Sequence, residues 1–109
     1  MVTVVSTSVP HQMIVDGGSK TFSSDTPPPS SEVSYGRVVE APDAVFAKMN
    51  EEHGFIDLHH AARKFAVADR VRIIPNHICV AMNLHECVYG VRGGVVEQVW
   101  QVAGRGKLQ

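Results

Sequence analysis

The sequence predicts an all-β domain: a small antiparallel β-barrel or sandwich with at most one or two short helices. Three observations point to this class. Short runs of β-branched residues recur, some of them alternating with polar residues; glycines and prolines separate the runs; and little of the chain has a helical pattern. Hydrophobic residues make up 44% of the 109 residues, enough for one core, so we expect residues 1–109 to form a single domain.

The first third of the chain contains two runs that are typical of strands. Residues 3–9 are rich in β-branched side chains and end before Pro10, and residues 12–16 form a second run that a glycine pair closes. We interpret residues 16–20 as a plain turn. Residues 23–34 contain three consecutive prolines and several serines, which predicts a flexible surface loop.

The middle of the chain is less clear. Residues 36–40 predict a short strand, and residues 55–58 form another short apolar run. Residues 43–53 fit a helical stripe and a strand face equally well. Residues 59–66 have the best helical composition in the chain, but this segment is too short to be stable as a helix alone.

The last third again predicts strands. Residues 67–74 alternate in their centre, with Arg70 and Arg72 on one side and Val71 and Ile73 on the other. Residues 87–92 and 95–100 flank a glycine pair, a pattern that predicts a β-hairpin.

Two residues that can bind a metal follow the alternating run. His77 and Cys79 are two positions apart, and on an extended backbone such residues point to the same face. An imidazole and a thiolate could together bind a divalent metal such as zinc. Water, substrate or groups elsewhere would have to complete the site, which favours a catalytic metal. The spacing alone is also common in proteins without metal, and Cys79 could instead be a nucleophile.

A second polar cluster, residues 51–54, contains His53 before a glycine. Such a cluster is most often a solvated turn, but His53 could carry a proton or support a metal ligand. The net charge is −1 and no basic run is present, so we expect no nucleic-acid partner. No apolar run approaches the roughly 18 residues of a membrane span. Cys79 and Cys87, the only cysteines, are expected to be thiols in a reducing cytoplasm.

Six motifs, in order along nearly the whole chain, resemble one family. They are the segments 16–20, 23–25, 35–36, 51–54, 69–79 and 91–106. Together they are similar to the carboxy-terminal domain of the metal-activated D-threonine aldolases and eukaryotic-type D-serine dehydratases. These are pyridoxal-phosphate enzymes with an alanine-racemase-like arrangement.

The resemblance implies a function. In that family a barrel domain binds pyridoxal phosphate through a lysine, and the β-domain supplies the metal ligands, which fall here on His77 and Cys79. The substrates would be D-amino acids with a 3-hydroxyl, cleaved as by a D-threonine aldolase or dehydrated as by a D-serine dehydratase. The metal would be zinc or manganese, and the cysteine favours zinc. His53, as a support for a metal ligand or a group on the substrate side, is the candidate catalytic residue. By the same resemblance a homo-oligomer is expected.

A barrel of about 250 residues cannot fit in this chain. We therefore expect the pyridoxal-phosphate barrel to be absent from it, to be supplied by a longer chain or a separate subunit, and the isolated domain to be inactive. None of the four lysines is assigned to the cofactor. Two alternatives remain open: a stand-alone β-barrel that binds a ligand or a protein without catalysis, and a thiol enzyme that uses Cys79 or Cys87.

Overall fold

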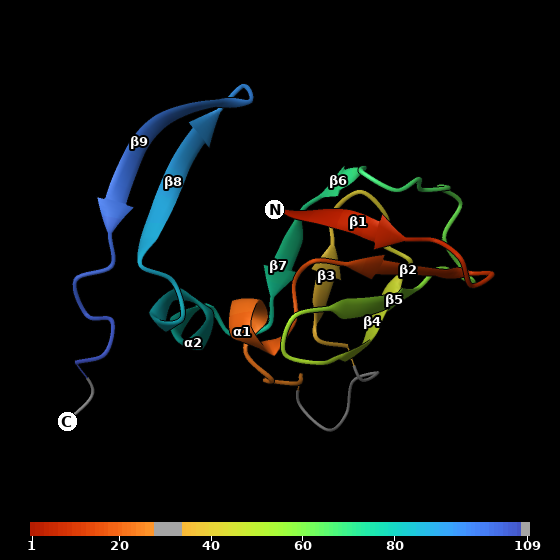
Figure 1. The fold of residues 1–109 in the computed structure, drawn as a ribbon, viewed down its shortest axis with the longest axis horizontal. Helices are drawn as coiled ribbons and strands as arrows, with labels where there is room; N and C mark the ends of the chain where they lie inside the picture. Colours follow the sequence, from red (N-terminus) through yellow and green to blue (C-terminus); the bar gives the residue numbers. More distant parts are fainter. Residues whose placement is uncertain (28–33, 108–109) are drawn as a thin grey trace.

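The computed structural model describes residues 1–27 and 34–107, and these residues form a mainly β structure with two short helices. Figure 1 shows a compact body, followed by α2 and a hairpin that stands apart from it. The predicted fold class is therefore confirmed. The elements are β1 (Val2–Ser6), β2 (Gln12–Val15), α1 (Ser19–Phe22), β3 (Gly36–Val38), β4 (Val45–Met49), β5 (Gly54–Asp57), β6 (Arg70–Val71), β7 (Ile73–Pro75), α2 (Ile78–Asn83), β8 (Cys87–Arg92) and β9 (Val95–Gln101).

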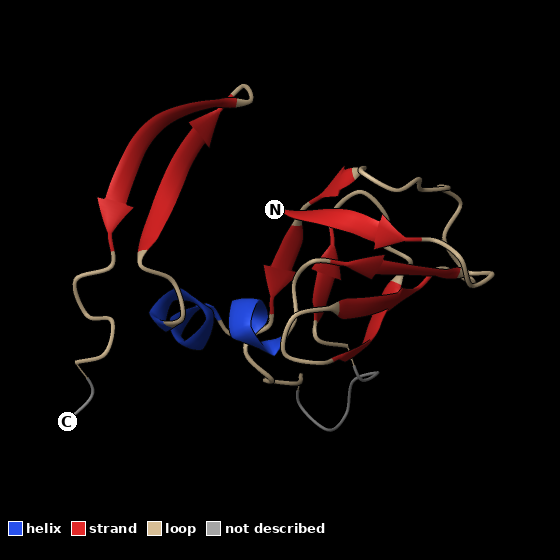
Figure 2. Ribbon diagram, in the orientation of Figure 1, coloured by secondary structure: helices blue, strands red, loops and turns tan. Residues whose placement is uncertain are grey.

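The body is built on an antiparallel five-stranded sheet with the order β4-β5-β2-β1-β6. A two-stranded sheet, β3–β7, packs beside it and supplies part of the same core. Figure 2 shows these strands wrapped around a common interior. Within the part of the chain that the structure describes, the sheets stay separate and form no closed barrel.

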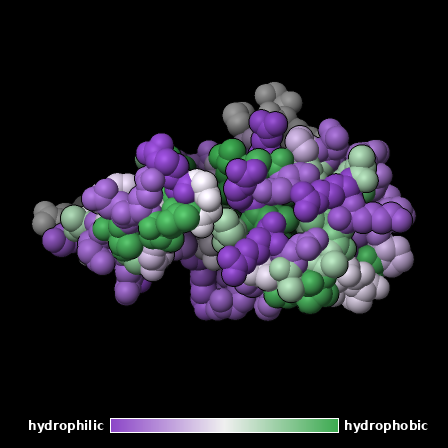
Figure 3. All heavy atoms as spheres, turned by 90° about the horizontal axis from the view of Figure 1, so that it is seen from above, coloured by the Kyte–Doolittle hydropathy of each residue, from purple (hydrophilic) through white to green (hydrophobic). Residues whose placement is uncertain are grey.

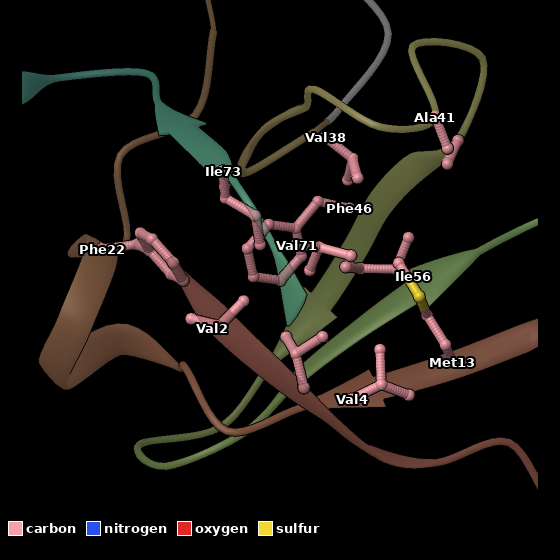
Figure 4. Close-up of a cluster of buried hydrophobic side chains, with 12 residues drawn as sticks. Val2, Val4, Met13, Phe22, Val38, Ala41, Phe46, Ile56, Val71 and Ile73 are labelled. Carbon is pink, nitrogen blue, oxygen red and sulfur yellow. The ribbon is translucent and has the colours of Figure 1, made fainter. Parts of the chain in front are cut away.

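The core follows from alternation along the strands. Every second residue of β1, β2 and β5 points inward, as the period of two requires. Phe46 of β4 lies at the centre, fully buried, with Phe22 and Tyr35 in edge-to-face contact at ring-centroid distances of 5.8 and 6.0 Å. Figure 4 shows Phe46 among aliphatic side chains from several strands. The fully buried large side chains are Phe46, Met13, Ile56, Val4, Val15, Val38 and Val71.

Several strand predictions are confirmed, with shorter bounds. The run at residues 3–9 gives β1, which ends at Ser6, and the run at 36–40 gives β3. The ambiguous residues 43–53 contain β4, which pairs with β5. The alternating residues 67–74 form β6 and β7 with a break at Arg72, and Val71 and Ile73 are buried as predicted.

The segment with the most helical composition forms no helix. Residues 59–66 are a series of turns and loop, in line with the expectation that they are too short to be stable as a helix alone. The turn predicted at residues 16–20 instead runs into α1, which begins at Ser19. Of the loop predicted at residues 23–34, positions 28–33 lie outside the described residues.

The hairpin predicted at the end of the chain is confirmed. Strands β8 and β9 pair antiparallel around Gly93 and Gly94, whose φ angles of 56° and 84° suit a tight hairpin turn. We call β8, β9 and their turn (residues 87–101) the arm. Among the described residues, no helix is both long enough and apolar enough to span a membrane.

Candidate functional site

The segment with the predicted metal ligands is a helix start rather than a strand. His77 has extended backbone angles, φ −133° and ψ 103°, and α2 begins at the next residue. Cys79 is therefore the second residue of a helix. Successive helical residues turn by about 100°, so the argument that His77 and Cys79 share one strand face is wrong.

The imidazole of His77 is fixed by a partner distant in the sequence. Its Nδ1 lies 2.7 Å from Oδ2 of Asp25, in the loop after α1. The neighbouring Asn76 donates hydrogen bonds from Nδ2 to the backbone carbonyls of Asp25 and Ser34, at 2.9 and 2.6 Å. With Nδ1 engaged by a carboxylate, Nε2 is the nitrogen left for a metal or a substrate.

Sequence reasoning gave Asp25 no role. Asp25 and His77 are 52 positions apart, and no spacing rule links them. Histidine ligands of metals usually bond a carboxylate or a carbonyl through the other ring nitrogen. This general preference could have predicted that His77 has such a partner, but not which residue it is.

Cys79 is an exposed free thiol, and Cys87 is a half-buried one. The Cys79 side chain lines a shallow, mainly apolar hollow with Val80, Met82 and Val102. His77 lines a different and more polar hollow with Asp25 and Asn76. The two side chains thus line different hollows, which have no lining residue in common.

His53 lies in the turn between β4 and β5. Its backbone N–H donates to Oδ1 of Asn50 at 2.6 Å, and its carbonyl accepts from the Asn50 N–H at 3.0 Å. This turn is bonded to the start of α1, because the backbone N–H groups of Ser19 and Lys20 donate to the carbonyls of Asn50 and Glu51. His53 is therefore exposed on a turn attached to the helix that leads to Asp25.

An ion pair between Lys20 and Glu52 adds to this attachment. Its hydrogen bond and charge interaction lower the pKa of Glu52 and raise that of Lys20. Both side chains are well exposed, so the pair is screened by water and contributes little to stability. Residues 51–53 are thus an exposed turn, as predicted for residues 51–54, whereas Gly54 is buried as the first residue of β5.

The two helices are joined at the end of α2. Nε2 of His85 lies 3.1 Å from the backbone carbonyl oxygen of Thr21, a hydrogen bond that links the residues after α2 to α1. Figures 1 and 2 show α1 and α2 side by side, between the body and the arm. We call this region, residues 18–25, 50–53 and 76–85, the helical rim.

The side chains of the helical rim fit a divalent metal in their chemistry. An imidazole held by a carboxylate and an exposed thiol are the donor types that zinc prefers. Over residues 1–27 and 34–107, however, the structure forms no group of three or more His, Cys, Asp and Glu side chains arranged to hold a metal ion. The rim can offer part of a ligand set.

Comparison of the sequence with known families identifies a family for most of the chain. The model described as "Putative serine dehydratase domain" matches residues 1–91. The 3-hydroxy-D-aspartate aldolase of Paracoccus denitrificans is 36% identical over 107 residues, covering 98% of this chain and 25% of that protein. An uncharacterized protein of Mycobacterium tuberculosis, Rv1414, is 35% identical over 97 residues, covering 89% of this chain and 71% of that protein.

Solved structures give the same result. The D-threonine aldolase of Filomicrobium marinum matches with a TM-score of 0.81 and 25% identity, over 99% of this chain and 28% of that one. The D-threo-3-hydroxyaspartate dehydratase of Delftia sp. HT23 matches with a TM-score of 0.78 and 27% identity, over 92% of this chain and 30% of that one.

The chain spans about a quarter of the length of the aldolases that it matches, and most of the mycobacterial protein. The family match covers most of the chain, from β1 into β8, and therefore includes the whole body and the helical rim. The chain belongs to the serine dehydratase domain family, whose relatives here include D-threonine and 3-hydroxy-D-aspartate aldolases and a D-threo-3-hydroxyaspartate dehydratase.

Proposed function

We propose that this domain binds a divalent metal through His77 and Cys79 and completes the active site of a pyridoxal-phosphate-dependent lyase. The substrates would be D-amino acids with a 3-hydroxyl group, and the reaction would be aldol cleavage or dehydration. One observation carries the proposal. Nδ1 of His77 lies 2.7 Å from Oδ2 of Asp25, and the exposed thiol of Cys79 follows His77 by two residues.

The names of the relatives support the choice of substrate. Two are aldolases named for D-threonine and 3-hydroxy-D-aspartate, and one is a dehydratase named for D-threo-3-hydroxyaspartate. Each of these names denotes a D-amino acid with a hydroxyl on carbon 3. A domain shared by aldolases and dehydratases would act on that common group rather than on the bond that breaks.

Two further structures of the dehydratase support the choice of ligands. In one a histidine is replaced by alanine, and in the other a cysteine two positions later is replaced, with the enzyme in its metal-free form. His77 and Cys79 have the same spacing. In this chain Nε2 of His77 and Sγ of Cys79 would be the donors, Asp25 would orient the imidazole, and the start of α2 would set the separation.

A bound metal would supply Lewis-acid assistance to the substrate 3-hydroxyl, and a thiolate donor favours zinc over manganese. Pyridoxal phosphate, bound by a barrel outside this chain, would supply the electron sink. His53 is proposed as a proton carrier, because its turn is bonded to the helix that leads to Asp25. The domain alone would be inactive, and the assembled enzyme would be a cytoplasmic homo-oligomer.

Metal analysis tests the proposal. The domain, assembled with its catalytic portion, is compared as wild type, His77→Ala and Cys79→Ala, with Cys87→Ala and His60→Ala as matched controls. We expect about one zinc per chain in the wild type and in the controls, and a loss of zinc and of activity in the two ligand variants. Full metal content and activity in both ligand variants would refute the assignment.

Asp25→Asn gives a finer test of the same site. The amide keeps the size of the side chain but removes the charge that polarises His77. We expect the metal to bind about 10- to 100-fold more weakly, the usual effect of losing such a partner. Competition with a chelator of known affinity measures the change, and Asp43→Asn, at an exposed position, is the control.

One observation favours a second candidate function, a stand-alone binding module without catalysis. This chain covers 71% of the mycobacterial protein Rv1414, so that protein has no room for a barrel of about 250 residues. The DNA sequence around the gene distinguishes the two candidate functions. A pyridoxal-phosphate barrel encoded in the same frame or beside it supports the lyase; the lack of one in the genome would favour the binding module.

A further inference from the structure

The arm is a two-stranded ribbon with two distinct faces. The register pairs Tyr89 with Val99 and Val91 with Val96, and paired residues in an antiparallel ladder share a face. We call these four side chains the first face; Cys87 opposite Gln101 lies on the same side, at the base of the arm. The second face carries three pairs: Val88 opposite Trp100, Gly90 opposite Gln98, and Arg92 opposite Val95.

The first face is apolar and exposed. Tyr89, Val96 and Val99 expose 62%, 53% and 49% of their surface, and Val91 is exposed to a similar degree. Figure 3 shows hydrophobic side chains at the surface of the smaller lobe, which includes the arm. Soluble domains seldom leave a group of large apolar side chains in water, so such a group indicates a contact surface.

The second face also carries large apolar side chains, beside the polar Gln98 and Arg92. The Trp100 indole lies against Gly90, where a Cβ atom would be 2.7 Å from two of its ring carbons, and it still exposes 50% of its surface. Val95 is also exposed, and near the turn Arg92 pairs with Glu97 at 3.0 Å. A strand that is apolar on both faces is typical of one buried on both faces.

The helical rim also exposes large apolar side chains. They are Ile78 and Val80 of α2, and Leu84, the residue that follows it. A hydrogen bond from the Val102 N–H to the Glu86 carbonyl closes the base of the arm next to α2. A partner that covered the arm would therefore also lie beside His77 and Cys79.

We infer that the arm is the docking element of this domain, inserted with both faces covered into an apolar groove of the catalytic portion of the lyase. This inference rests on the proposed function, because it takes the rest of the enzyme as the occupant. The likeness to the Filomicrobium aldolase covers 99% of this chain, arm included, and leaves about 70% of that enzyme's chain to surround it.

Area argues against a second copy as the occupant. A seven-residue ribbon is about 24 Å long and about 10 Å wide, so two arms packed face to face would bury only about 500 Å². A stable interface buries about 1,200 to 2,000 Å². A groove that takes up both faces of the arm and the apolar side of α2 comes much closer to that range.

Hydrogen exchange of the arm tests the inference. The backbone amides of residues 87–101 are followed in the isolated 109-residue chain and in the enzyme assembled with its catalytic portion. We expect those on the outer edges of β8 and β9 to exchange at least about tenfold more slowly in the assembly. Equal rates in both states, together with lyase activity, would overturn the docking but leave the proposed function standing.

A charged substitution gives the second measurement. Val99→Asp is compared with Val9→Asp, which places the same change on an equally exposed valine (50%) of the body. We expect Val99→Asp alone to weaken assembly at least about tenfold in sedimentation, with an unchanged circular dichroism spectrum of the isolated chain. Equal assembly of both variants, or a dimer of the isolated chain that Val99→Asp breaks, would overturn the inference. A protected arm in an assembly without lyase activity would instead count against the proposed function.

Discussion

The body and the arm have the same kind of sequence but opposite surroundings. Both consist of short strands rich in valine, but only in the body does burial alternate with a period of two. In the body the apolar residues meet in a core where Phe46, Met13 and Ile56 are fully buried. In the arm every residue of β9 is exposed.

This difference shows which part of the chain buries its own apolar side chains and which part does not. The body has sheets on several sides of one core, so its hydrophobic side chains cover one another. The arm has two strands only, and a two-stranded ribbon is marginally stable in water without packing. The body should therefore fold by itself, whereas the arm should depend on a partner.

Phe46→Ala should have the largest effect on the stability of the body. The ring is fully buried and contacts Phe22 and Tyr35 edge to face, so its removal leaves a cavity at the centre of the core. We expect a loss of about 3 to 5 kcal/mol in the free energy of unfolding. Urea denaturation of the isolated chain measures it; a loss under about 1 kcal/mol would show that the body is not held by this core.

Gly18→Ala should destabilise the junction between the body and the helical rim. A Cβ at Gly18 would overlap the backbone carbonyl oxygens of Asn50 and Glu51, which accept hydrogen bonds from Ser19 and Lys20. Backbone atoms cannot rotate away, so we expect a loss of about 1 to 3 kcal/mol. Gly104→Ala, where a Cβ would meet open space, is the control in the same urea titration.

The sequence predicted the strands better than it predicted the rim. Runs of β-branched and apolar residues identified β1 and β2, and the glycine pair identified the β8–β9 hairpin, because strand propensity and turn residues act locally. The helical composition of residues 59–66 gave no helix, and α1 was missed. Segments this short take their structure from contacts with the rest of the molecule, as α1 does through Asn50 and Glu51.

The candidate site shows the same limit. His77 and Cys79 were chosen from their residue types and spacing. The extended backbone assumed for both holds only for His77, because Cys79 lies in the first turn of α2. Asp25 reaches His77 only because the loop after α1 folds back beside β7. Local pattern could identify the donors, but the partner that orients His77 depends on tertiary structure.

Glu40→Gln should have an intermediate effect that depends on pH. Burial raises the pKa of Glu40, whose side chain is 15% exposed, but its hydrogen bonds with Arg72 outweigh this and leave the pKa below the ordinary value of 4.5. Because the folded pKa is lowered, the stabilisation is present at neutral pH and is lost as the pH falls through and below 4.5. We expect a loss of about 1 kcal/mol at pH 7 and almost none at pH 3.

Glu97→Gln is the matched change in the arm. Glu97 forms an ion pair with Arg92 that is exposed to solvent, so water screens the two charges. In urea titrations of the isolated chain at pH 7 and pH 3, this variant should differ little from the wild type at either pH. A loss equal to that of Glu40→Gln would mean that the arm is packed as firmly as the body, contrary to the comparison.

Val99→Ala should have the smallest effect in the isolated chain and a larger one in the assembled enzyme. Val99 exposes half of its surface to water, so its truncation should change the free energy of unfolding by less than about 0.5 kcal/mol, against about 2 kcal/mol for Val4→Ala in the core. If the arm lies in a groove, the same truncation removes buried apolar area there and should weaken assembly by about 1 to 2 kcal/mol. Urea titration and sedimentation measure the two values. A substitution that is silent in one state and costly in the other identifies a side chain whose packing partner belongs to another part of the enzyme.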